Sequence, residues 1–142
     1  PAGGCLLTDP EFSHRLRDLI AHGELTENGV HLLKVGRHFR LDPVTKAVVG
    51  RNREDNARIA RLAREGDLLL DPVDIPGPTT LLRGDQNERN LATAAALTIM
   101  YAKGQAKHTL VARNLSGGQR ILESGPADPQ TAARLMLVKT RG

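Results

Sequence analysis

The chain has 142 residues and a formal net charge of +4, which predicts a single domain able to bury a core without disulfides. Its single cysteine excludes an internal disulfide and a cysteine-based zinc site, and is typical of a reducing cytosol. No apolar run approaches the roughly 20 residues that a membrane span needs, so we expect a soluble, cytoplasmic protein with no membrane partner.

The N-terminal segment predicts one amphipathic helix. Thr8 or Asp9 can cap it, Pro10 suits its first position, and Gly23 is a natural stop. Residues 24–29 form a turn-rich connector. We expect residues 1–29 to be a lead-in helix and connector from a preceding domain, and residues 30–142 to be the main domain. A first residue that is proline rather than methionine suggests a piece of a longer polypeptide.

Two strands are predicted next, over residues 35–41 and 46–51. Alternation along the first strand places Phe39 on the core face, with His38 and Arg40 on the opposite face, free to meet a ligand. For His38, a structural hydrogen-bonded role is the alternative. Arg37 falls on the apolar face, where a buried guanidinium needs a carboxylate or carbonyl partner.

An arginine-rich helix follows the second strand, with Asn52 as its predicted N-cap. Guanidinium groups and free helix N–H groups both favour phosphate oxygens, so the start of this helix is a candidate polyanion-binding surface. A solubilising arginine face is the alternative interpretation. Five arginines lie between positions 51 and 64 against two acids, Glu54 and Asp55: Arg51, Arg53, Arg58, Arg61 and Arg64.

The C-terminal half alternates between strands and helices. Strands are predicted over 67–71 and 79–83, a stiff proline-rich loop over 72–78, and a long helix over 87–103. A hairpin over 108–114 and 119–124 and a short helix from Asp128 through Leu137 complete the chain. Lys103 and Lys107 could extend the basic surface. The pattern predicts a single α+β domain, with a small mixed or antiparallel sheet and two to four flanking helices.

Several motifs resemble a known family. The run from Val48 to Asn52, then Glu54 to Asn56, Asp67 and Pro76 to Thr79, is similar to the RNA-binding domain of the NFACT proteins over about residues 30 to 112. The runs 2–9 and 36–40 resemble a bacterial branch in which this domain follows an ATP-dependent tRNA thiouridine synthase. At the matching positions, eukaryotic and archaeal members of this family have sequences similar to Asp-Ile-Trp-Phe-His, followed by Gly-Ser-His. This chain has Asp67-Leu68-Leu69-Leu70-Asp71 and Gly77-Pro78-Thr79 instead, so the roles of the family's tryptophan and histidines do not carry over.

The resemblance implies an RNA-binding domain that docks tRNA, or another structured RNA, for a thiolation enzyme in the preceding domain. Aromatic residues make up only 2% of the chain, so we expect contacts with phosphates, 2′-hydroxyls and overall shape rather than stacking on a long aromatic surface. The expected RNA-binding residues are Arg37, His38, Arg40, Arg51, Asn52, Arg53, Asn56, Arg58 and Arg61.

Catalytic motifs are absent from the sequence. It has no phosphate-binding glycine loop, no dinucleotide fingerprint and no metal-ligand spacing among its five histidines, so no cofactor or metal is expected here and ATP would act in the preceding domain. By resemblance, Cys5 lies where the synthase domain would end and this domain begin, and it could carry persulfide sulfur. An ordinary cysteine is the alternative to that role. A protein-interaction module, for example one that binds the ribosome, is a further alternative to RNA docking.

Overall fold

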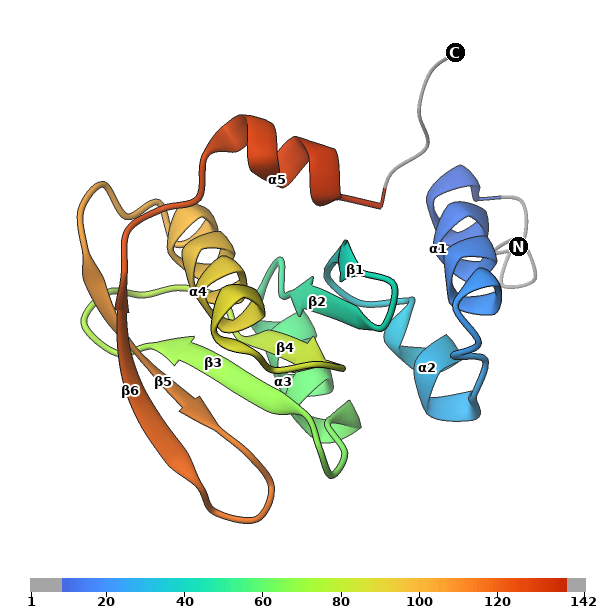
Figure 1. Ribbon diagram of the computed structural model, residues 1–142, viewed down its shortest axis with the longest axis horizontal. Coiled ribbons are helices and arrows are strands. Elements are labelled where there is room, and N and C mark those ends of the chain that lie inside the picture. Colours follow the sequence, from blue (N-terminus) through green and yellow to red (C-terminus); the bar gives the residue numbers. More distant parts are fainter. Residues whose placement is uncertain (1–8, 138–142) are drawn as a thin grey trace.

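The computed structural model describes residues 9–137, which form a six-stranded antiparallel sheet and five helices (Figure 1). The predicted α+β class is confirmed, with five helices rather than two to four. The order of the strands across the sheet is β1-β2-β4-β3-β5-β6. Their bounds are β1 Arg37–Asp42, β2 Thr45–Val49, β3 Leu68–Pro72, β4 Thr80–Arg83, β5 His108–Arg113 and β6 Gln119–Ser124.

Helices cover both faces of the sheet (Figure 1). On one face, the small residues Ala94 and Ala95 let α4 approach the strands closely, beside Leu70 and Leu110. On the other face, Ile59 of α3 packs against strand residues and α2. The helix bounds are α1 Pro10–Ala21, α2 Glu27–Leu32, α3 Arg53–Leu62, α4 Glu88–Tyr101 and α5 Pro129–Leu135.

Polar side chains fix where each of these helices begins. Each cap accepts a hydrogen bond from a backbone N–H two or three residues further on, which satisfies a donor that the helix cannot pair. The sequence indicated a cap at Thr8 or Asp9 for α1, at Asn52 for α3 and within residues 85–88 for α4, and it predicted that α5 starts at Asp128. The five cap residues are Asp9, Thr26, Asn52, Asn87 and Asp128.

The short helix α2 lies partly where the sequence predicted a connector. Asn28 and Gly29 are poor helix formers, which is why local preference indicated a turn. In the structure, a Cβ at Gly29 would lie 2.9 Å from the carbonyl oxygen of Glu24. The chain therefore needs glycine for this close approach. Leu32 of α2 is fully buried against the sheet and α3, and this tertiary packing overrides the local preference.

Both edges of β1 and both of its faces are engaged. Its free edge carries an isolated bridge between Phe39 and Met136, and the Leu137 N–H donates to the His38 carbonyl oxygen at 2.8 Å. The layer of α1 and α2 covers the face opposite Phe39. The prediction that this face is open to a ligand is therefore wrong.

Among the described residues, no helix is long and apolar enough to cross a membrane.

Candidate functional site

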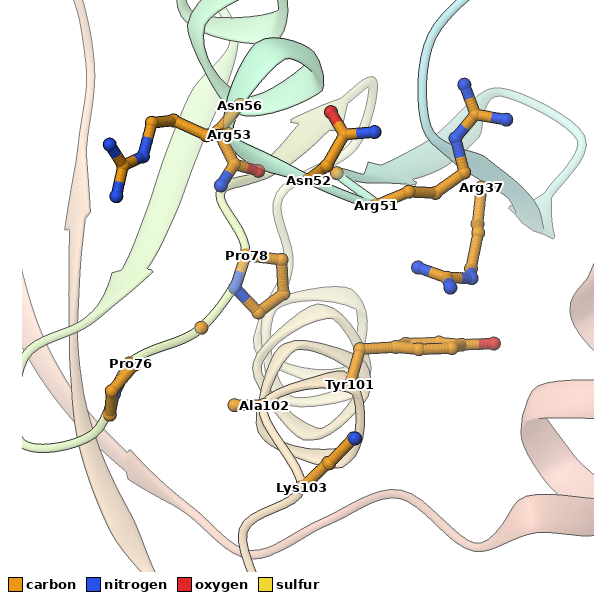
Figure 2. Close-up of a pocket in the computed structure, with 12 residues that line it drawn as sticks. Arg37, Arg51, Asn52, Arg53, Asn56, Pro76, Pro78, Tyr101, Ala102 and Lys103 are labelled. Atoms are coloured by element: carbon orange, nitrogen blue, oxygen red, sulfur yellow. The ribbon is translucent and has the colours of Figure 1, made fainter.

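A cleft of about 530 Å³ opens where β2 leads into α3 (Figure 2). Its other walls are the loop after β3, around Pro76 and Pro78, and the C-terminal end of α4. None of the lining residues is acidic. Four of them are cationic: Arg37, Arg51, Arg53 and Lys103. Such a cavity favours an anionic ligand.

Backbone contacts hold the junction between β2 and α3 against the loop before β4. The Gly50 N–H donates to the Thr79 carbonyl oxygen at 3.0 Å, and the Asn56 Oδ1 accepts from the Thr79 N–H at 3.0 Å. A Cβ at Gly50 would overlap the Asn56 amide oxygen. Glycine at position 50 therefore allows Asn56 to fasten the wall of the cleft.

Asp55 organises the start of α3. Its Oδ2 accepts from the Gly36 and Arg51 N–H groups, both at 3.1 Å, and from the Arg51 Nε at 2.7 Å. Burial alone would raise the pKa of Asp55, but the bonds from Arg51 and from the backbone lower it. Arg51 is therefore held in place and partly neutralised, although its side chain is still 44% exposed.

Three of the four cations have no acidic partner within the described part of the chain, namely Arg37, Arg53 and Lys103, and their positions differ. The Arg37 guanidinium lies over the Tyr101 ring, 4.4 Å from its centroid, so an aromatic face replaces the carboxylate or carbonyl expected from the sequence. Arg53 is exposed, and its side chain points away from that of Arg51, to the other side of Asn52 (Figure 2).

Lys103 enters the cleft from an unusual backbone conformation. Its φ of 62° makes it the one residue other than glycine with a positive φ in the described range. The Lys103 N–H donates to Met100 O and the Gly104 N–H to Ile99 O, both at 3.0 Å, which closes the end of α4. Glycine normally occupies this position after a helix, so a lysine there carries backbone strain.

The structure divides the nine predicted binding residues into three groups. Arg58 and Arg61 are exposed on α3 but line a different groove of about 330 Å³, together with His31 and Lys34. His38 and Arg40 lie away from both cavities. Five of the nine gather at the cleft: Arg37, Arg51, Asn52, Arg53 and Asn56.

The prediction of an RNA contact for His38 is wrong, because its side chain is fully buried. Its Nε2 lies 3.0 Å from the Leu32 oxygen and 2.9 Å from the Val35 oxygen, so this nitrogen carries the proton and donates. Burial and the nearby Lys46 hold the pKa of His38 well below its usual value. The alternative, a structural role, is correct.

The prediction for Arg40 is also wrong. Its guanidinium reaches Asp18 at 2.7 Å and Glu24 at 2.8 Å, and only 12% of its side chain is exposed. Burial alone would lower the pKa of Arg40, but the hydrogen bonds that it donates to Glu24 and Asp18 raise it. Arg40 therefore fastens α1 and the connector to the sheet, and carboxylates occupy four of its five N–H donors.

The nine expected RNA-binding residues did not include Tyr101 and Lys103, which complete the cleft, although the sequence indicated that Lys103 could extend the basic surface. The sequence offered one signal for Lys103, a lysine placed before Gly104 at the end of a helix. It offered none for the pairing of Tyr101 with Arg37.

Cys5, the proposed sulfur carrier, lies outside the described residues.

Comparison with known proteins agrees with this geometry. The sequence profile of the NFACT protein RNA binding domain matches residues 36–136, from β1 to the end of α5. The chain belongs to the NFACT RNA-binding domain family. Every residue that lines the cleft lies inside the match. RNA binding in general is therefore supported for this NFACT domain.

The solved structures that share the fold of this NFACT domain include the C-terminal part of the fibronectin/fibrinogen-binding protein from Streptococcus suis, with a TM-score of 0.62 and 19% sequence identity. The alignment covers 92% of this chain and 63% of that one, so this domain spans less than two thirds of its length. At this identity the likeness concerns the fold alone. A search of curated proteins found no match.

Proposed function

We propose that this domain docks tRNA in the cytoplasm for a tRNA-thiolating enzyme domain in the same polypeptide. It would hold the RNA through phosphates and shape, take no cofactor itself, and leave the use of ATP to the preceding domain. The observation that carries the proposal is the cleft at the β2–α3 junction, where four cations and no acid line one cavity. Phosphate contacts of this kind dominate affinity for nucleic acid.

The second groove on α3 could extend the contact. Arg58 and Arg61 are exposed there, beside His31 and Lys34. Both cavities are bordered by α3, one at its N-terminal end and one along its side, so a single RNA backbone could follow the helix from one to the other. If about four to six phosphates are engaged, the affinity should fall steeply with salt, with a log–log slope of about −0.7 to −0.9 per contact.

Three charge-matched double variants test this proposal. The first removes the cleft cations Arg53 and Lys103, the second removes Arg58 and Arg61, and the third is a control that removes the exposed Arg17 of α1 and Arg89 of α4, all by substitution with alanine. The affinity for tRNA is measured over a range of salt concentrations. The cleft variant should reduce the magnitude of the salt slope by about 1.4 to 1.8, and the control should leave it unchanged.

Equal losses in all three variants would contradict the proposal, because they would indicate general charge attraction. Docking for catalysis has its own test in the polypeptide that carries the domain. The cleft variant should raise KM for tRNA and leave kcat unchanged, because docking contributes equally to ground-state and transition-state binding. A fall in kcat at constant KM would count against a docking role.

A further inference from the structure

The cleft contains a flat cationic platform in addition to its charge. The Arg37 guanidinium lies over Tyr101, and the Tyr101 ring rests against Phe39, with 6.0 Å between the ring centroids and 53° between the planes. Phe39 is fully buried, which anchors the platform in the core. Nucleobases stack on aromatic rings and on guanidinium planes alike, so this pair offers a surface suited to a base.

The wall opposite this platform is preformed. Pro76 and Pro78 restrict the backbone of the loop after β3. A Cβ at Gly77 would lie 2.7 Å from the Cβ of Ala102, so the loop presses closely against the end of α4. The volume of about 530 Å³ is within the range of cavities that enclose small ligands. Phosphate contacts alone need no such cavity.

The polar groups of the cleft are donors. Lys103 and Arg53 supply ammonium and guanidinium N–H groups without acidic partners in the described residues. The Asn56 Oδ1 is occupied by the Thr79 N–H, while no partner for the Asn56 Nδ2 is found in the same part of the chain. Donors of this kind match the acceptors of a nucleotide, namely phosphate oxygens and base carbonyls.

We infer that the cleft takes one unpaired nucleotide, whose base stacks on the Arg37–Tyr101 pair while its phosphates lie against Lys103 and Arg53. A base inside a duplex cannot reach this platform, whereas a base splayed from a loop or an end can. This inference rests on the proposed RNA-docking function and adds a preference for single-stranded segments.

The chain provides its own probe for the test. Tyr101 is the only tyrosine, and there is no tryptophan, so tyrosine emission reports on this site alone. Short oligouridylate is the ligand, because its strands do not pair with themselves, and a duplex RNA with the same number of phosphates is the comparison. The emission should change saturably with oligouridylate and much less with the duplex.

A conservative variant separates stacking from charge. Arg37→Lys keeps the positive charge but removes the planar group, so it should weaken oligouridylate binding about tenfold and leave the salt slope unchanged. The same replacement at the exposed Arg17 is the matched control and should change neither quantity. Binding of labelled oligouridylate to Tyr101→Phe, followed by anisotropy, should stay close to wild type because the ring is kept.

Two results would overturn the inference while tRNA docking stands: unchanged Tyr101 emission at saturating oligouridylate, or wild-type affinity in Arg37→Lys. In either case, tRNA binding that still depends on Arg53 and Lys103 would keep the docking function. If the wild-type protein bound neither tRNA nor oligouridylate, the docking function and the inference would both be refuted.

Discussion

Replacing Lys103 with glycine should stabilise the fold and weaken RNA binding at the same time. A residue with a side chain pays roughly 1 to 2 kcal/mol for a left-handed conformation such as the φ of 62° at this position. Glycine avoids that cost but loses about 0.5 to 1 kcal/mol of additional chain entropy on folding. The net gain in the free energy of unfolding should be about 0.5 to 1 kcal/mol.

The backbone hydrogen bonds that end α4 do not involve the lysine side chain, so the variant should keep them. For a domain of this size, the midpoint of thermal unfolding should rise by about 1 to 4 °C. The same variant loses one cleft cation, and the magnitude of the salt slope for tRNA binding should fall by about 0.7 to 0.9. Thermal unfolding and salt titration measure the two effects separately.

Lys107→Gly is the matched control. Lys107 is exposed on the same connection, does not line the cleft and has no positive φ. This variant loses the same charge, but it should not gain stability, and its tRNA binding should be close to wild type. A lower unfolding midpoint in Lys103→Gly, or wild-type tRNA binding by it, would refute the reasoning about strain and function at this residue.

Three further predictions concern the layer that α1 and α2 form on the sheet. Arg40→Ala leaves two carboxylates without their partner and should lower the free energy of unfolding in urea by about 3 kcal/mol; an unchanged urea midpoint would contradict this. Burial lowers the pKa of Lys46 to about 8, so wild-type stability should rise with pH between about 8 and 10.4. Lys46→Met should be more stable near neutral pH and lack that rise, because it removes a buried ammonium that has no hydrogen-bond partner; a less stable variant would argue against an unpaired charge. Burial also lowers the pKa of His38, so the free energy of unfolding should fall as the pH drops below about 6.5, by at most about 1.4 kcal/mol per pH unit. His38→Gln should flatten that dependence between pH 6.5 and 5, and an identical slope in both proteins would exclude His38 as its source.

Local signals predicted most of the secondary structure. Asn52 marked the start of α3 and Pro129 that of α5, because caps and helix-start prolines act within a few residues. Gly23 ended α1 within two residues of the observed bound. The helix α2 was missed because its stability comes from packing that no local pattern contains.

The sequence also indicated five of the twelve residues that line the cleft. Arg53 and Asn56 could be assigned to a binding surface because they lie next to a predicted strand end and a predicted helix start. Alternation correctly placed His38 and Arg40 on the face opposite Phe39. It could not show that another layer covers that face, because a period of two separates the faces of a strand without revealing what packs on each.

By itself, the sequence determined the six strands, the helices other than α2, the family resemblance and the concentration of arginine at the start of α3. Tertiary structure alone decided which cations are available. Arg40 is paired with carboxylates that lie 16 and 22 residues away. Tyr101, at the C-terminal end of α4, meets Arg37 of β1, and Lys103 lines the same cleft. Charge and periodicity are local properties of a chain, but the partner of a cation is set by which distant segments the fold brings beside it.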